Sequence, residues 1–207
     1  MKTLKQYRKY PFSFLLKIIL WLSAIITIGV VITIVGYILI KGIPNLNLHL
    51  FEWKYNTTNV SMTPALINTF IMVALALLIA LPIGVFSAIY LVEYAKKGSK
   101  LVKVIRITTE TLQGIPSIVF GLFGFLLFVI GLGWNYSLIS GVITLSIMIL
   151  PLIMRTTEEA LLAVPDSYRE GSFGLGAGKL RTVFKVVLPS AIPGILSGVI
   201  LAIGRMV

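Results

Sequence analysis

Apolar residues in this chain form long runs separated by short basic segments. The first run, Ile18–Ile40, contains 23 residues without a charge, and a helix needs about 20 apolar residues to cross a bilayer. A second uncharged run, Thr111–Met154, has 44 residues, enough for two such helices with a turn near 131–137. We therefore predict an all-α integral membrane protein with about five spans, at 18–40, 64–92, 113–130, 137–154 and from 188 onward.

Small residues mark one face of the predicted second span. Ala76, Ala80, Gly84 and Ala88 recur every four positions, so they lie on one stripe of a helix. Small side chains let helix backbones approach closely, which is a main packing device in lipid. We expect this stripe to face another helix.

The N-terminus begins as a secretion signal would, with a basic arm at residues 1–17 before an apolar run. That run exceeds the usual core of about 7–15 residues, and no small-residue cleavage site follows it. We interpret 18–40 as an uncleaved first span. The connector 41–63 carries Phe51, Trp53 and Tyr55, aromatic residues typical of a membrane interface.

Basic residues set the predicted orientation. Five Lys or Arg lie in the N-terminal arm, five follow the second span and five follow the fourth, whereas two lie in 41–63 and none in the turn after the third span. Because cytoplasmic loops are enriched in Lys and Arg, this places the N-terminus and both long connectors in the cytoplasm. The same clustering at span ends argues that the net charge of +11 does not indicate nucleic-acid binding.

Several kinds of chemistry lack the necessary residues. The chain has no cysteine and a single histidine, His49, which excludes disulfides, thiolate sites and histidine-based metal sites. No Walker A sequence is present, so we expect neither a catalytic residue nor a cofactor in this chain. We interpret His49 as a solvated loop residue.

The second basic connector, residues 155–189, has features of a structured loop. Ser167 and Glu170 match a helix capping box, which predicts a short helix over 168–175, and Gly176 or Gly178 is suited to end it. Two interpretations remain open at this point. The helix either lies on its own membrane domain as a surface connector or docks into a groove of a partner protein.

Three stretches of sequence resemble a known family. They are the spacing from Glu170 through Gly176 to Leu188-Pro189, the string Arg155–Glu170, and Leu112–Gly124 with its Gln113-Gly114-Ile115-Pro116-Ser117 core. Together they resemble the permease subunits of phosphate ABC importers, those of the PstA kind, whose EAA loop docks onto an ATPase. The resemblance extends over 63–207, although Gly171 and Ser172 replace the usual alanines.

The resemblance implies a MetI-like type I importer fold with six spans in the cytoplasmic membrane of a bacterium or archaeon. It also implies three partners: a second permease of the PstC kind, ATPase subunits that bind ATP and Mg, and an extracytoplasmic phosphate-binding protein. Only about five spans are recognisable, so we expect the permease domain at 64–207 to be truncated at its C-terminus. The implied ATPase-coupling residues are Ser167, Tyr168, Arg169, Glu170, Gly171, Gly176, Leu188 and Pro189.

Arg205 is a charge within the predicted fifth span. A charged side chain in lipid is costly, by about 2.5–3.5 kcal/mol on translocon scales, so it faces protein or water. The resemblance places this position on the phosphate path, and a guanidinium suits a phosphate oxyanion. Alternatively, Arg205 lies near the outer interface and snorkels, or pairs with a glutamate outside this sequence.

Polar residues near the third span and the positions of the acidic residues bear on alternative interpretations. We expect Glu110 to pair with Arg106 one helical turn earlier. We expect Gln113 and Ser117 either to line a polar path or to bond their own helix.

A self-sufficient secondary transporter would need acidic residues within its spans, whereas all seven acidic residues lie in connectors or at span ends. A permease for another ABC importer substrate and a membrane anchor are the remaining alternatives.

Overall fold

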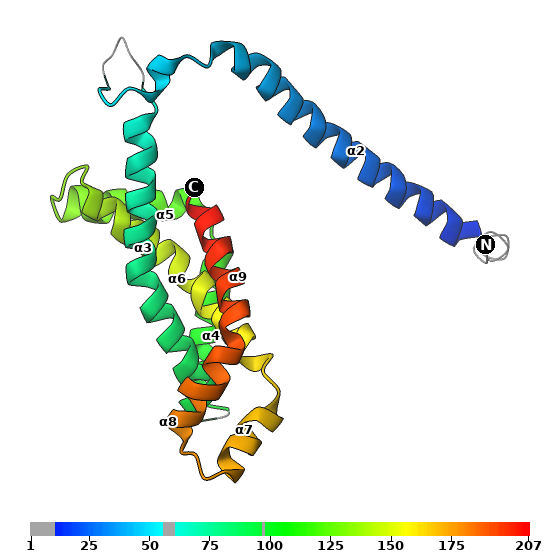
Figure 1. Cartoon of the computed structure of the whole chain (residues 1–207), viewed down its shortest axis with the longest axis vertical. Coiled ribbons are helices and arrows are strands. Elements are labelled where there is room, and N and C mark those ends of the chain that lie inside the picture. The colour runs from blue at the N-terminus through cyan, green and yellow to red at the C-terminus, as the bar shows by residue number, and fades with distance from the viewer. Residues whose placement is uncertain (1–10, 56–60, 97) are drawn as a thin grey trace. The chain divides into compact units, whose positions relative to one another are not determined.

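The computed structural model describes residues 11–55, 61–96 and 98–207, and their regular secondary structure is entirely helical (Figure 1). The chain divides into two compact units, Met1–Pro64 and Ala65–Val207. The all-α prediction is therefore confirmed. Most of the expected basic arm, parts of the connector 41–63 and Lys97 lie outside the described residues.

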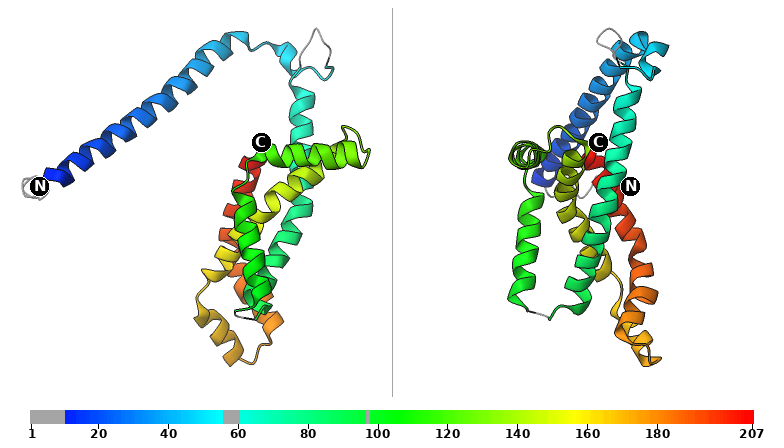
Figure 2. Two further views of the ribbon diagram at one scale, coloured as in Figure 1. Left: turned by 180° about the vertical axis from the view of Figure 1, so that it is seen from behind. Right: turned by 90° about the vertical axis from the view of Figure 1, so that its left-hand side faces the viewer.

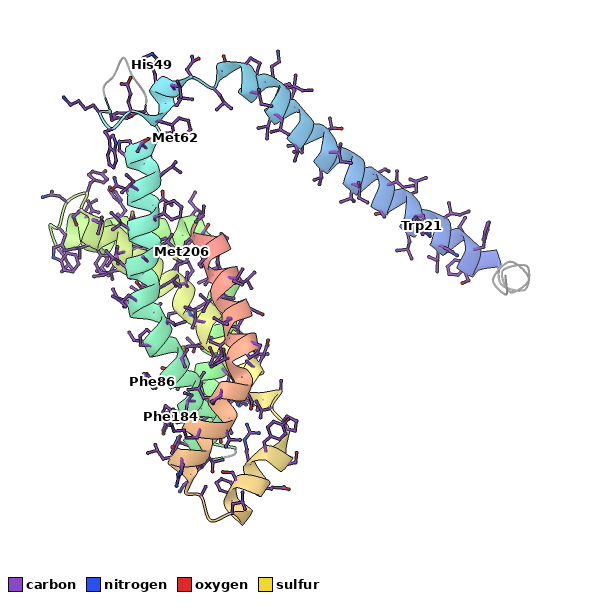
Figure 3. The ribbon with its side chains drawn as sticks, viewed as in Figure 1. Trp21, His49, Met62, Phe86, Phe184 and Met206 are labelled. Carbon is purple, nitrogen blue, oxygen red and sulfur yellow. The ribbon has the colours of Figure 1, made fainter. Side chains whose placement is uncertain are left out.

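The described part of the first unit is dominated by helix α2, Pro11–Gly42, followed by the short 3-10 helices η1, Ile43–Asn45, and η2, Leu48–Phe51. The candidate membrane span Phe12–Asn45 buries none of its apolar window within the protein, and Trp21 projects from the ribbon (Figure 3). Such an all-round apolar helix requires lipid or a partner as its solvent. His49 lies in η2, exposed, with Nδ1 2.6 Å from Oε1 of Glu52.

Helix α3, Thr63–Ile89, carries the predicted small stripe and continues as the π-helical turn η3, Tyr90–Tyr94. All four stripe residues are buried. At Gly84 an added Cβ would lie 2.7 Å from Cγ2 of Ile153. The prediction that this stripe packs against another helix is confirmed, and that helix is α6, Leu138–Leu162.

The span expected at 113–130 is helical from Ser117 to Gly131, but a sharp bend that was not expected precedes it. Helix α4, Lys100–Gln113, and the pair formed by α5, Ser117–Gly124, with π-helical η4, Phe125–Gly131, are bent by 99°, as Figure 2 shows from the side. Pro116 explains the break, because proline has no N–H to donate and disfavours a helical conformation in the preceding residue. The basic connector after the second span is therefore largely helical, and the uncharged run begins in the last turn of α4.

Helix α6 is the element on which the second unit is packed. Besides Gly84, three glycines allow a neighbouring helix to approach it: Gly124 of α5 at Thr144, Gly194 of α9 at Ala160, and Gly198 of α9 at Thr156. Helix α9, Leu188–Met206, contains the predicted fifth apolar run. Within the part of the chain that the structure describes, four helices are long and apolar enough to cross a membrane, or five if the bent pair counts as one.

Two ion pairs join α4 to α6 in place of the expected Arg106–Glu110 pair. Arg106 lies 2.6 Å from Glu158, whose side chain is only 6% exposed, and Glu110 lies 3.1 Å from Arg155. The expected pairing is wrong because a buried carboxylate on α6 requires a cation far more than an exposed one does. Glu110 is 56% exposed and already meets water.

The close approach of α9 to α6 can be tested at Gly194. A Cβ there would lie 2.6 Å from Cβ of Ala160 and 3.4 Å from its Cα, so Gly194→Ala forces the two helices apart at a cost of about 1–3 kcal/mol. We expect the melting temperature of the detergent-solubilised protein to fall by several degrees. Gly204→Ala is the control, because Gly204 lies in the same helix with open space around it. This substitution should leave the melting temperature unchanged or raise it slightly. Equal melting temperatures for the two variants would contradict this packing.

Candidate functional site

The first candidate site is the segment between α6 and α9, which contains α7, Asp166–Gly174, and α8, Lys179–Thr182. The π-helical turn η5, Val183–Val187, links it to α9. Figure 1 shows α7 and α8 at the end of the second unit opposite the C-terminus. Helix α7 buries none of its residues. It therefore leaves a polar and aromatic surface open for contact.

The predicted capping box is wrong in its details. Helix α7 begins at Asp166 with Pro165 as its N-cap, and no side chain caps it. Asp166 instead places a carboxylate in the first turn, where it interacts favourably with the helix dipole, and it accepts a hydrogen bond from Nη1 of Arg169 at 3.1 Å. The predicted stop holds at Gly176, which has a φ of +81°, a conformation that glycine adopts without steric cost.

Arg169 is the most highly connected side chain of this segment. Its Nε and Nη2 donate to Oε1 of Glu93 at 3.0 and 2.9 Å. Nη2 and Nη1 also donate to the backbone oxygens of Leu161 at 2.9 Å and Val164 at 2.8 Å. Together with Asp166, these acceptors occupy all five N–H donors of the guanidinium.

This arrangement ties α7 to two other elements. Leu161 and Val164 lie at the end of α6, where the last carbonyls of a helix have no partner within it. Glu93 lies in η3, and the side chains of Arg169 and Glu93 are only 15% and 9% exposed. Sequence reasoning missed Glu93, which was placed at the start of a solvated connector. No local signal could have found it, because the two residues are 76 positions apart.

A second set of contacts holds α8 to the same place. Nζ of Lys179 lies 5.0 Å from the ring centroid of Tyr94, a cation–π geometry. The hydroxyls of Ser172 and Thr182 are 2.9 Å apart and connect α7 to α8. Both helices are therefore fastened to η3.

The predicted coupling residues divide into two groups. Ser167, Tyr168, Glu170, Gly171 and Gly176 are exposed on the α7 segment, whereas Arg169 faces inward. Leu188 and Pro189 lie apart from them in the first turn of α9. Leu188 packs against the apolar cluster around Ile89 and Val187. Of the predicted coupling residues, only the first group therefore lies on the outer surface of this segment.

The second candidate site is Arg205, in the last turn of α9. Its Nη2 donates to the backbone oxygens of Ile115 at 3.3 Å and Gln113 at 3.4 Å. Both carbonyls lie at the break between α4 and α5, and the side chain of Gln113 donates to the backbone oxygen of Pro151 at 2.8 Å. Gln113 therefore bonds a neighbouring helix and not its own. Ser117 is exposed in the first turn of α5.

Arg205 retains capacity to bind an anion. Both hydrogen bonds of the Arg205 side chain come from Nη2. Among the described residues, no carboxylate forms an ion pair with Arg205. The side chain borders a hollow of about 600 Å³ together with Leu152, Ser197, Ile200, Leu201 and Gly204. Its Nε and Nη1 thus retain N–H donors, and the guanidinium retains its charge, for an oxyanion.

Comparison with known proteins agrees with this architecture. The family model "Binding-protein-dependent transport system inner membrane component" matches residues 80–207. The chain is similar to the probable ABC transporter permease protein YqgI of Bacillus subtilis, with 36% identity over 89% of this chain and 63% of that protein. It is also similar to the phosphate transport system permease protein PstA 1 of Mycobacterium tuberculosis H37Rv, with 40% identity over 69% of this chain and 46% of that protein.

A solved structure shares the fold. The MetNI methionine ABC transporter in an inward-facing conformation aligns with a TM-score of 0.56 and 25% identity, over 70% of this chain and 67% of that one. The MetI-like fold expected from the sequence is thereby confirmed. The chain spans about half to two thirds of the length of the curated relatives named above. It belongs to the family of binding-protein-dependent transport system inner membrane components.

Proposed function

We propose that this chain is a membrane-spanning permease subunit of an ATP-driven importer that moves inorganic phosphate across the cytoplasmic membrane. The observation that carries the proposal is the exposed α7 segment, fastened through Arg169 to the ends of α3 and α6. A surface helix held to two spans is suited to transmit a partner's movement to them. The substrate is inferred from the phosphate permeases among the relatives.

The proposed complex supplies what this chain lacks. A second permease of the PstC kind completes the pore, ATPase subunits bind ATP and Mg beneath α7, and an extracytoplasmic protein delivers phosphate. The chain itself has no catalytic residue and no nucleotide site in this scheme. The excess of Lys and Arg in the N-terminal arm and in both long connectors supports a cytoplasmic N-terminus.

In the proposed cycle, closure of the ATPase dimer displaces α7, and the spans rock between inward- and outward-facing states. Tyr168 and Glu170 contact the ATPase, and Gly176 sets the turn between α7 and α8. Arg205 binds a phosphate oxygen through an N–H donor that the carbonyls at the α4–α5 break leave unused. The break between α4 and α5 positions this guanidinium, because its carbonyls hold Nη2.

The role of Arg205 is tested by Arg205→Gln in the full-length permease expressed with its partners. Glutamine keeps a polar amide, but it is shorter than arginine and has no charge for an oxyanion. We therefore expect phosphate uptake to fall at least tenfold while membrane levels and ATPase copurification stay normal. Lys103→Gln, an exposed charge on α4, serves as the control. Unchanged uptake in Arg205→Gln would leave Arg205 as a structural cap of the α4–α5 break.

The contact with the ATPase is tested at Gly176, whose positive φ penalises any Cβ by about 1–2 kcal/mol. Gly176→Ala should distort the turn from α7 to α8 and reduce ATPase copurification severalfold. Gly178→Ala is the matched control, because Gly178 has a φ of −72° and open space around it. Glu170→Arg should also abolish ATPase binding without affecting membrane insertion. Normal uptake in both Gly176→Ala and Glu170→Arg would refute coupling through this segment.

A further inference from the structure

We propose that the ion pair between Arg169 and Glu93 is the joint through which the α7 segment moves α3, so that both are positioning residues for transport. This inference rests on the proposed function, since it assigns a mechanical route to the coupling segment. Arg169 lies among the exposed residues of α7 in sequence, yet its side chain points into the protein and reaches η3. It is therefore poorly placed to contact an ATPase directly.

The contacts on η3 come from two separate helices. Arg169 of α7 binds Glu93, and Lys179 of α8 lies over the adjacent Tyr94. The contact between the hydroxyls of Ser172 and Thr182 links α7 to α8. A displacement of the α7 segment therefore acts on two consecutive residues of one turn.

The element that receives this displacement is suited to transmit it. Thr63–Tyr94 forms one continuous helical span of 32 residues, with η3 as its last turn. A π-helical turn is wider than an α-helical one and is frequent at functional sites. The backbone leaves the helix at Ala95. Glu93 is thus attached to the very end of the span, where a pull acts on the whole helix.

The geometry also separates the joint from the anchor of α7. Removing the Glu93 carboxylate eliminates the bonds to α3 but leaves Arg169 bonded to Leu161, Val164 and Asp166. Helix α7 then remains attached to α6. Glu93→Ala should therefore detach α7 from η3 and leave α7 bonded to α6 and Lys179 over Tyr94, whereas Arg169→Gln would loosen α7 from both helices.

The test uses the full-length permease assembled with its second permease, ATPase and phosphate-binding protein in proteoliposomes, with phosphate uptake and ATP hydrolysis measured together. For Glu93→Ala we expect normal assembly, ATP hydrolysis within about twofold of wild type, and uptake reduced at least tenfold. Glu93→Gln, which keeps an acceptor oxygen, should recover part of the uptake per ATP. Glu159→Ala, an exposed carboxylate on α6, is the control and should remain coupled. A proportional fall of uptake and hydrolysis in Glu93→Ala, or no change in either, would overturn the proposal.

A second readout does not depend on the transported substrate. Because the chain has no cysteine, spin labels can be placed at Leu78 on α3 and Leu196 on α9, both of which are exposed. The distance between them should change when ATP and vanadate are added to the otherwise wild-type complex, and should not change in Glu93→Ala. An identical change in both would overturn the joint. If the wild-type complex moves its labels but takes up no phosphate, the proposed substrate fails, and the label distances in Glu93→Ala still decide the joint.

Discussion

Backbone carbonyls at interrupted helices impose a constraint on this chain, because a buried carbonyl without a hydrogen-bond donor costs free energy. Two of the interruptions are closed by an arginine from a distant part of the sequence. Arg169 binds the carbonyls of Leu161 and Val164 at the end of α6, and Arg205 binds those of Gln113 and Ile115 between α4 and α5. A guanidinium is suited to this task, since it carries five donors and a charge that complements the negative end of a helix. The two candidate functional residues are therefore also the ones that close the helix breaks.

The remaining packing follows from the lack of a hydrophobic driving force between helices in lipid. Helix α6 is approached at glycine by α3, α5 and α9, so backbones are in near contact at several points along its length. Such close packing favours rigid-body movement of helices over local deformation. The break at Pro116 and the π-helical turns η3, η4 and η5 interrupt this regular packing. In the proposed mechanism, movement enters α3 at η3. This explains why the contacts of the α7 segment at η3 matter more than its exposed position suggests.

The sequence predicts the features that depend on local composition. Apolar runs correctly predicted α2, α3, α6 and α9, and the four-residue period of small side chains correctly predicted the buried face of α3. The 99° bend was missed although Pro116 signals it, because an uncharged run of 44 residues suggested a simple hairpin. The pair Arg106–Glu158 was missed because Glu110 offered Arg106 a local partner. The pair Arg169–Glu93 was missed because its residues are 76 positions apart in the sequence. Arg205 was identified from its charge within an apolar run and from the family resemblance, but its carbonyl partners depend on a bend that was not predicted.

The proposed role of this permease is phosphate transport that uses ATP hydrolysed by a partner. The most direct measurement is accumulation of radiolabelled phosphate in proteoliposomes containing the full-length permease, the second permease, the ATPase and the binding protein. We expect radiolabelled phosphate to accumulate only when ATP is present. Unlabelled phosphate should compete with this accumulation, whereas sulfate and methionine should not. ATP-dependent accumulation of another solute, with none of phosphate, would contradict this role.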